Sequence, residues 1–204
     1  MLIPLSELVL KYDVKFKGIL HVGAHECEEI HDYEKYIDRN NILWIEALLN
    51  KVEFSKQLYP GVLIENALVS DKIERVKFNI SNNGQSSSLL EFGLHSHYHS
   101  HIHYIASYET ETKLLKDVIS KYNINYNFLN LDIQGAELKA LKGMEEYLNN
   151  IDYIYTEVNS DYVYKDCVLI TELDEYLKKF NFYRVETKWC EDFKWGDAFY
   201  IKNN

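Results

Sequence analysis

Residues 18–25 are Gly-Ile-Leu-His-Val-Gly-Ala-His, an apolar run of strand length that ends in a turn of small residues. A strand that leads into such a turn is typical of the first β-α unit of an open parallel sheet. Gly23 and Ala24 carry no bulky side chain, so the main chain there can approach a ligand closely. The stretch therefore predicts a binding site at the carboxyl end of the first strand.

Outward from this stretch, short apolar runs alternate with longer amphipathic ones, the pattern of β-α repeats. The predicted strands are residues 18–23, 42–47, 62–67, 127–132 and 152–158. The predicted helices are residues 28–38, 51–58, 112–122, 136–148 and 171–180. Strand-like runs at 182–187 and 197–201 follow, with too short a connection for a crossover helix, which forces an antiparallel pair. We expect an α/β fold with seven strands, five of them parallel, the last strand beside the fifth, and helices on both faces.

The composition predicts one globular domain over residues 1–204, with 47% hydrophobic and 26% charged residues. The apolar runs are far shorter than the roughly 20 residues of a membrane-spanning helix, so no membrane partner is expected. The three cysteines show no Cys-x-x-Cys spacing, and we expect reduced thiols in a cytoplasmic protein. The net charge of −10 repels phosphate backbones, which argues against nucleic acid as a partner.

An acid follows the second predicted strand, where a nucleotide-like cofactor would need one. Glu46 lies 23 residues after Gly23, close to the spacing of about 20 at which a carboxylate holds ribose hydroxyls. The alternative is a solvated strand end without a ligand. The turn lacks a full Gly-x-Gly-x-x-Gly, and glutamates at 26, 28 and 29 would repel a pyrophosphate. A cofactor with a ribose and no phosphate, S-adenosylmethionine, is favoured over a dinucleotide.

A second polar group follows the fourth predicted strand, in Leu131-Asp132-Ile133-Gln134-Gly135-Ala136-Glu137. Asp132 is expected to point into the crevice, where a carboxylate can hold an ammonium group or take a proton from a hydroxyl. The alternative is that Asp132 only caps the following helix, a common role for an acid at such a junction.

Residues 128–137, followed by Leu141-Lys142-Gly143, resemble the hallmark of the FkbM family of methyltransferases. Further matches run along nearly the whole chain, at residues 18–24, 44–47, 66–71, 86–90, 155–159 and 195–200. The resemblance implies a Rossmann-like methyltransferase sheet, S-adenosylmethionine as methyl donor, and transfer to a hydroxyl oxygen, often of a sugar or secondary metabolite. It also implies that Glu46 binds the ribose and that Asn66 and Ala67 lie near the adenine.

The first motif departs from the family pattern Asp-Val-Gly-Ala-Asn-x-Gly. This chain has His21 for the aspartate, His25 for the asparagine and Cys27 for the last glycine. We expect Asp132 as the base, with His25 and Glu157 as the next candidates. The expected cofactor-binding residues are His21, Gly23, Ala24, His25, Glu46, Ala47, Asn66, Ala67, Asp132 and Gln134.

Residues 81–111 are polar and contain glycine, as binding loops often do, and we place the acceptor site there. The expected substrate-binding residues are Ser87, Ser88, His95 and Glu137. The histidines at 95, 97, 99, 101 and 103 alternate, so in a strand they would line one face and could hold a metal. The favoured interpretation is polar loop histidines and no metal site.

The sequence thus predicts an O-methyltransferase that acts on a hydroxyl of a small molecule or glycan. Two alternatives remain at this stage: a non-catalytic binding or scaffold protein on the same fold, and a metal-dependent enzyme organised by the histidine row.

Overall fold

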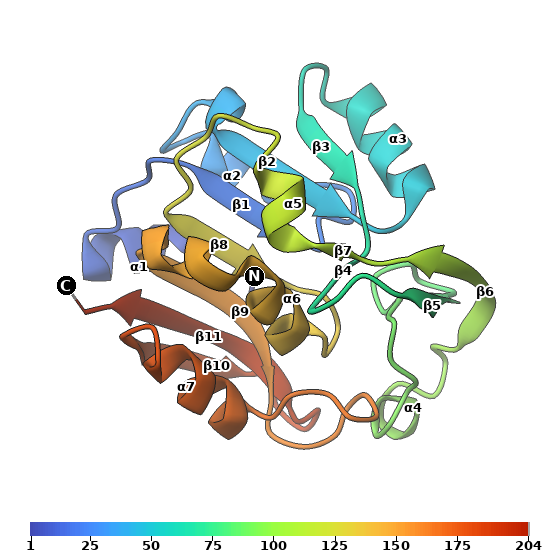
Figure 1. The fold of residues 1–204 in the computed structure, drawn as a ribbon. Coiled ribbons are helices and arrows are strands. Elements are labelled where there is room, and N and C mark those ends of the chain that lie inside the picture. Colours follow the sequence, from blue (N-terminus) through green and yellow to red (C-terminus); the bar gives the residue numbers. More distant parts are fainter. Residues whose placement is uncertain (204) are drawn as a thin grey trace.

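The computed structural model describes residues 1–203, and a seven-stranded sheet forms its centre (Figure 1). In spatial order the strands are β10 (Phe182–Trp189), β11 (Trp195–Lys202), β9 (Tyr153–Asn159), β8 (Phe128–Leu131), β1 (Ile19–Val22), β2 (Ile42–Glu46) and β3 (Leu63–Asn66). Neighbours from β9 to β3 are parallel, whereas β11 is antiparallel to β9 and β10. The expected strand arrangement is confirmed, including the last strand beside the fifth.

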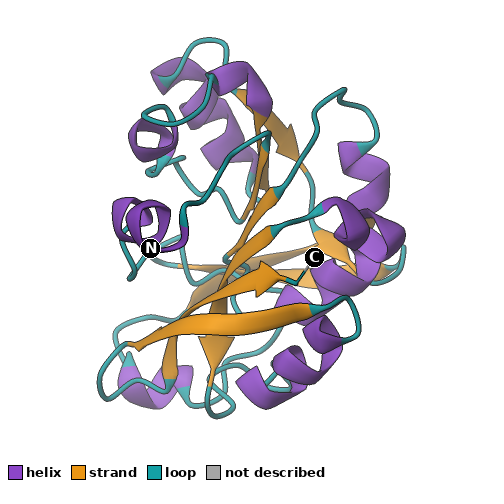
Figure 2. Cartoon of the chain, turned by 90° about the vertical axis from the view of Figure 1, so that its left-hand side faces the viewer, coloured by secondary structure: helices purple, strands orange, loops and turns teal. Residues whose placement is uncertain are grey.

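Helices cover both faces of the sheet (Figure 2). One face carries α1 (Leu5–Tyr12), α2 (Ile30–Tyr33) and α3 (Leu49–Leu58), and the other carries α5 (Leu115–Ile119), α6 (Glu137–Met144) and α7 (Ile170–Lys178). The short 3-10 helices are η1 (Arg39–Asn41) and η2 (Glu145–Asn150). The helix predicted for 136–148 changes to 3-10 form after Met144, because Glu145 takes a φ of 50°. Within residues 1–203, no helix has the length and apolar character needed to cross a membrane.

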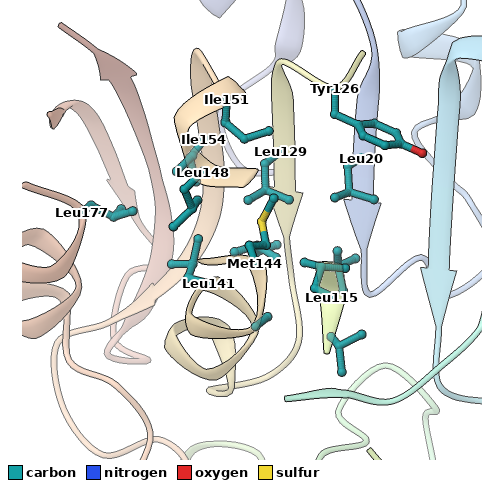
Figure 3. Packing of buried hydrophobic residues seen from close by; sticks show 14 of the residues in the cluster. Leu20, Leu115, Tyr126, Leu129, Leu141, Met144, Leu148, Ile151, Ile154 and Leu177 are labelled. Atoms are coloured by element: carbon teal, nitrogen blue, oxygen red, sulfur yellow. The ribbon is translucent and has the colours of Figure 1, made fainter. Parts of the chain in front are cut away.

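Side chains of the central strands pack into two separate hydrophobic cores, one on each face of the sheet, because successive residues of a strand point to opposite faces. On β1, Ile19 packs beneath α1 to α3, and Leu20 packs beneath α5 to α7. Figure 3 shows Leu141 and Met144 of α6 beside Leu129 of β8 in the second core. Burial on both faces explains why the central strands are nearly continuous apolar runs in the sequence.

The segment between β3 and α5 forms a small lobe beside the sheet. It contains β4 (Val69–Ser70), β5 (Arg75–Ser81), α4 (His95–Tyr98), β6 (Tyr104–Glu111) and β7 (Lys113–Leu114). The expectation of a continuous loop over residues 81–111 is therefore wrong for its last part, since β6 pairs antiparallel with β5. Most β6 side chains are exposed, so no alternation of apolar and polar residues marks the strand in the sequence.

Two leucines on helices should differ strongly in how much the protein is destabilised when each is replaced by alanine. Leu141→Ala removes a fully buried side chain from the core under α6, and we expect a loss of about 2–5 kcal/mol in the free energy of unfolding. Leu10→Ala is the matched control, because Leu10 of α1 is 88% exposed, and its expected change is below about 0.5 kcal/mol. Urea denaturation followed by circular dichroism measures both; equal losses would contradict the assigned packing.

Candidate active site

A cavity of about 430 Å³ opens where β1, β2, β8 and β9 end. Such a volume lies within the range of about 300–1,000 Å³ that is typical of ligand sites. Among the described residues that line it there are five acids and no lysine or arginine; the acids are Glu28, Glu29, Glu46, Asp132 and Glu157. The N-terminal ammonium group of Met1 also lines the cavity, but it is paired with Glu29 at 3.5 Å. The acids therefore outnumber the cations, and the cavity favours a ligand that is neutral or positively charged.

The turn after β1 forms one wall and packs directly against the end of β8. Gly23 has a φ of 89°, and a Cβ built on it would lie 1.8 Å from the carbonyl oxygen of Asp132. The amides of Gly23 and Ala24 both donate to the carbonyl of Ile45, at 2.9 and 3.0 Å. The contact between these strand ends thus requires glycine at position 23.

Glu46 joins the β1 turn to the end of β2. Its Oε2 accepts a hydrogen bond from the His25 amide at 2.7 Å, and its Oε1 accepts one from the Leu48 amide at 2.7 Å. Burial raises the pKa of Glu46, and these backbone hydrogen bonds oppose the rise. The side chain of Asn66 donates to the carbonyls of Glu46 and Ala47, so it fixes the main chain there.

A hydrogen-bonded group of two carboxyls and one amide forms the opposite wall. Nε2 of Gln134 donates to Asp132 at 2.6 Å and to Glu157 at 2.8 Å, while the Tyr164 hydroxyl donates to Oε1 of Gln134 at 2.6 Å. Asp132 is exposed, whereas Glu157 is buried on β9. Burial, followed by the charges of Asp132 and Glu137, raises the pKa of Glu157 well above its usual range. Glu157 therefore keeps its proton to a higher pH than an ordinary glutamate.

Glu137 supports this loop from beneath. Its Oε1 accepts hydrogen bonds from the amides of Ile133 and Gly135, at 3.1 and 3.0 Å, while its Oε2 is buried and has no partner among residues 1–203. Burial raises the pKa of Glu137 to about 7. These bonds hold Gln134, at a φ of 58°, in the conformation that joins the two carboxyls.

The two histidines of the first motif lie in different environments. His21 is buried, stacks on Trp44 at 4.6 Å between ring centroids, and its Nδ1 lies 3.0 Å from the Tyr33 hydroxyl. Burial lowers the pKa of His21, so the ring is neutral at pH 7. His25 has a φ of 43° and places Nδ1 2.5 Å from Glu28.

Metal-binding side chains do not converge at the histidine row. The chain from 95 to 98 forms α4, so these histidines do not share the face of one strand. Within residues 1–203, the group of three or more ligand-type side chains whose atoms lie within 4.8 Å of one another is His25, Glu26 and Glu28. The Lys51 amino group forms a salt bridge with Glu26, so the charge of one carboxylate in this cluster is already neutralised.

The remaining wall comes from the lobe and from the segment after β9. His95, His99, Ser86, Tyr164 and Trp195 line it. Ser86, His99 and Trp195 were not named individually as site residues, although Ser86 and His99 lie in the predicted acceptor segment 81–111 and Trp195 begins the family-like stretch 195–200.

Most predicted site residues meet at the cavity. Those that line it are His21, Gly23, His25, Glu46, Ala47, Ala67, Ser87, His95, Asp132, Gln134 and Glu157. Four others are not part of the lining but form hydrogen bonds with backbone groups near the cavity: Ala24, Asn66, Ser88 and Glu137. Among these, Ser88 donates to the carbonyl of Gln134 at 2.9 Å and so ties the lobe to the loop after β8.

The strand order, the small turn after β1 and the acid that ends β2 are those of a Rossmann-like methyltransferase. Residues 21–183 match the family described as the methyltransferase FkbM domain, and the chain belongs to this family. It is an S-adenosylmethionine-dependent methyltransferase. No curated protein matches the chain.

Solved structures with the same fold share little sequence with the chain. Magnesium protoporphyrin IX methyltransferase from Synechocystis PCC 6803, with bound S-adenosylmethionine, has a TM-score of 0.54 at 9% identity, covering 97% of this chain and 76% of that one. An S-adenosylmethionine-dependent methyltransferase from Clostridium acetobutylicum has a TM-score of 0.54 at 6% identity, covering 98% and 89%. A 1,6-didemethyltoxoflavin N1-methyltransferase from Burkholderia thailandensis has a TM-score of 0.50 at 10% identity, covering 98% and 76%. These likenesses concern the fold.

The residues present fit S-adenosylmethionine. The cofactor carries a sulfonium and an ammonium group and no phosphate, which suits a cavity lined by acids and by no lysine or arginine among the described residues. Glu46 is fixed by two amides, yet each carboxylate oxygen retains the capacity for a further hydrogen bond.

We expect Glu46→Gln to weaken binding of S-adenosylhomocysteine at least about 10-fold, since one charged acceptor of hydrogen bonds is lost from the cavity. Isothermal titration calorimetry measures the Kd. Glu26→Gln is the matched control, because Glu26 lies next to the same turn but outside the cavity lining, and it should leave the Kd within about 2-fold. Unchanged binding by the Glu46 variant would remove this residue from the cofactor site.

The raised pKa of Glu137 gives a testable dependence of stability on pH. The folded-state pKa of about 7 exceeds the usual 4.5, so the folded protein binds the proton more tightly than the unfolded chain. The free energy of unfolding should therefore fall as pH rises from about 4.5 through 7. Glu137→Gln mimics the protonated side chain and should flatten this fall in urea titrations from pH 5 to 8. Parallel curves for the two proteins would contradict the assignment.

Proposed function

We propose that the protein is an O-methyltransferase whose acceptor is a hydroxyl group of a sugar or glycan. One observation carries the proposal: the wall formed by the lobe offers hydroxyl, amide and imidazole groups, and no lysine or arginine of the described chain lines the cavity. Groups that both donate and accept hydrogen bonds match a polyhydroxyl ligand. A polyanion is disfavoured, because five acids line the cavity and the Met1 ammonium beside them is paired with Glu29. The family resemblance, which often involves sugars, supports the same acceptor class.

The cofactor half of the cavity is assigned to the ends of β1, β2 and β3. Glu46 would hold the ribose hydroxyls, and Ala47 and Ala67 would lie against the adenine. Gly23 leaves room for the methionine portion to approach the main chain. Asn66 acts indirectly, because its side-chain amide is committed to the carbonyls that follow β2.

The bound cofactor supplies a methyl group made electrophilic by its positively charged sulfur. This chain contributes alignment of the acceptor oxygen and a place for its proton. Asp132 is the first candidate for the proton acceptor, because it is exposed to the cavity and only its Oδ1 is bonded to Gln134. Glu157 is the weaker candidate, since burial and the charges of Asp132 and Glu137 raise its pKa and so disfavour the basic carboxylate form, and His25 is the third.

Asp132→Asn tests this role, because asparagine keeps the acceptor for Gln134 but removes the basic carboxylate. We expect kcat to fall about 100-fold or more, while the free energy of unfolding changes by no more than about 1 kcal/mol. Asp117→Asn on α5, an exposed aspartate away from the cavity, is the control. Formation of S-adenosylhomocysteine, measured by mass spectrometry, gives kcat. Normal turnover by the Asp132 variant would transfer the role to His25 or Glu157.

The acceptor class is tested with wild-type protein and labelled S-adenosylmethionine. Neutral sugars, oligosaccharides and nucleotide sugars are compared with phenols, peptides and RNA, and transfer is read by mass spectrometry. We expect methyl ethers on carbohydrate hydroxyls. Methylation of a phenol, peptide or RNA with every carbohydrate inert would overturn the proposal.

A further inference from the structure

His95 is the most constrained side chain on the lobe side of the cavity. Its ring lies parallel to Phe92, with centroids 4.2 Å apart and 5° between the planes, and Phe92 stacks in turn on Tyr104 at 4.0 Å. The backbone amide of His95 donates to the carbonyl of Val163 at 2.9 Å. Ring and main chain are therefore both fixed before a ligand enters, since α4 is joined to the segment after β9 (Figure 1).

One ring nitrogen of this imidazole lacks a hydrogen-bond partner. His95 is 5% exposed and lines the cavity, yet its Nδ1 is buried and has no hydrogen-bond partner among residues 1–203. Tyr164, whose ring lies 5.4 Å away, uses its hydroxyl to donate to Gln134 instead. A buried polar group that lacks a partner is unfavourable unless a ligand supplies one.

The groups around His95 also keep it uncharged. Burial is the largest cause that lowers the pKa of His95, to about 4, and the neighbouring His99 and His101 add to it. From the other packed elements, Tyr164 and Tyr104 present aromatic rings and no charge. The imidazole is therefore neutral at pH 7 and offers one hydrogen-bond donor and one acceptor.

We propose that His95 is a specificity-determining residue of the acceptor subsite, which hydrogen-bonds a hydroxyl group of an uncharged polyhydroxyl acceptor and discriminates against phosphorylated or carboxylated ones. The inference rests on the proposed O-methyl transfer to carbohydrates. The discrimination follows from the charges of the lining: an anionic acceptor would meet the carboxylate of Asp132, and the one cation among the described lining residues, the Met1 ammonium, is already paired with Glu29.

His95→Phe separates ligand recognition from packing. Phenylalanine keeps a flat ring against Phe92 but removes both nitrogens. If His95 served only to pack the lobe, this variant would leave acceptor kinetics unchanged. His97→Gln is the matched control, because His97 belongs to the same short helix but is exposed and lies outside the cavity lining.

The experiment measures methylation of methyl glucoside, methyl galactoside and methyl rhamnoside, with glucose 1-phosphate and glucuronic acid as the charged counterparts. For a neutral sugar that wild type methylates, we expect His95→Phe to lower kcat/KM about 10-fold to 100-fold, mainly through KM. The Kd of S-adenosylhomocysteine should stay unchanged, and the Tm should not fall. The sugar should also shift the side-chain ¹⁵N resonances of His95 in wild type, and His97→Gln should behave as wild type.

The outcomes separate the two proposals. Equal kcat/KM for wild type and His95→Phe on a neutral sugar, or preference for the phosphorylated or carboxylated sugar, overturns the role of His95 and leaves carbohydrate methylation standing. If no sugar is methylated and none shifts the His95 resonances, both proposals fall.

Discussion

The contact between the turn after β1 and the end of β8 is the constraint on which the site depends. Gly23 approaches the carbonyl of Asp132 so closely that any Cβ would lie 1.8 Å from the oxygen, and its amide is bonded to Ile45. Three strand ends are locked together by this packing. As a result, the acid that ends β2 and the acid that follows β8 line the same cavity, although Glu46 and Asp132 are 86 positions apart in the sequence.

Electrostatics then determine what this cavity can hold. Several carboxyl groups are buried or half-buried there with backbone amides, and with the side-chain amide of Gln134, as their hydrogen-bond donors. The loop after β8 can donate these hydrogen bonds because its backbone is left-handed at Gln134 and Gly135, with φ of 58° and 94°. Such a conformation persists at a non-glycine residue because surrounding hydrogen bonds over-determine it. The result is a site that suits a cofactor with a positively charged sulfur.

Much of the fold could be predicted from local patterns. The five parallel strands correspond to apolar runs, and the final antiparallel pair to two strand-like runs with a short connection, so their spacing leaves little choice of topology. The exposed strand β6 was not predicted, because it contributes few buried side chains. The helix predicted from residue 28 begins only at Ile30, after the chain turns at Cys27 with a φ of 59°, and it ends at Tyr33. The periodicity of apolar residues cannot reveal a helix or strand that contributes few side chains to the hydrophobic core.

The sequence by itself determined the class of fold, the family, and the acids and small residues at the strand ends, because covalent order and periodicity place those residues at one edge of a parallel sheet. Only the tertiary structure decided which side chains face the cavity and which hold the scaffold. Asn66 and Ser88 donate hydrogen bonds to backbone carbonyls, and Glu137 is buried beneath the loop after β8. His95 stacks on Phe92 and is uncharged. Those outcomes depend on burial and on partners far along the chain, such as Gln134 for Ser88, which no local pattern records.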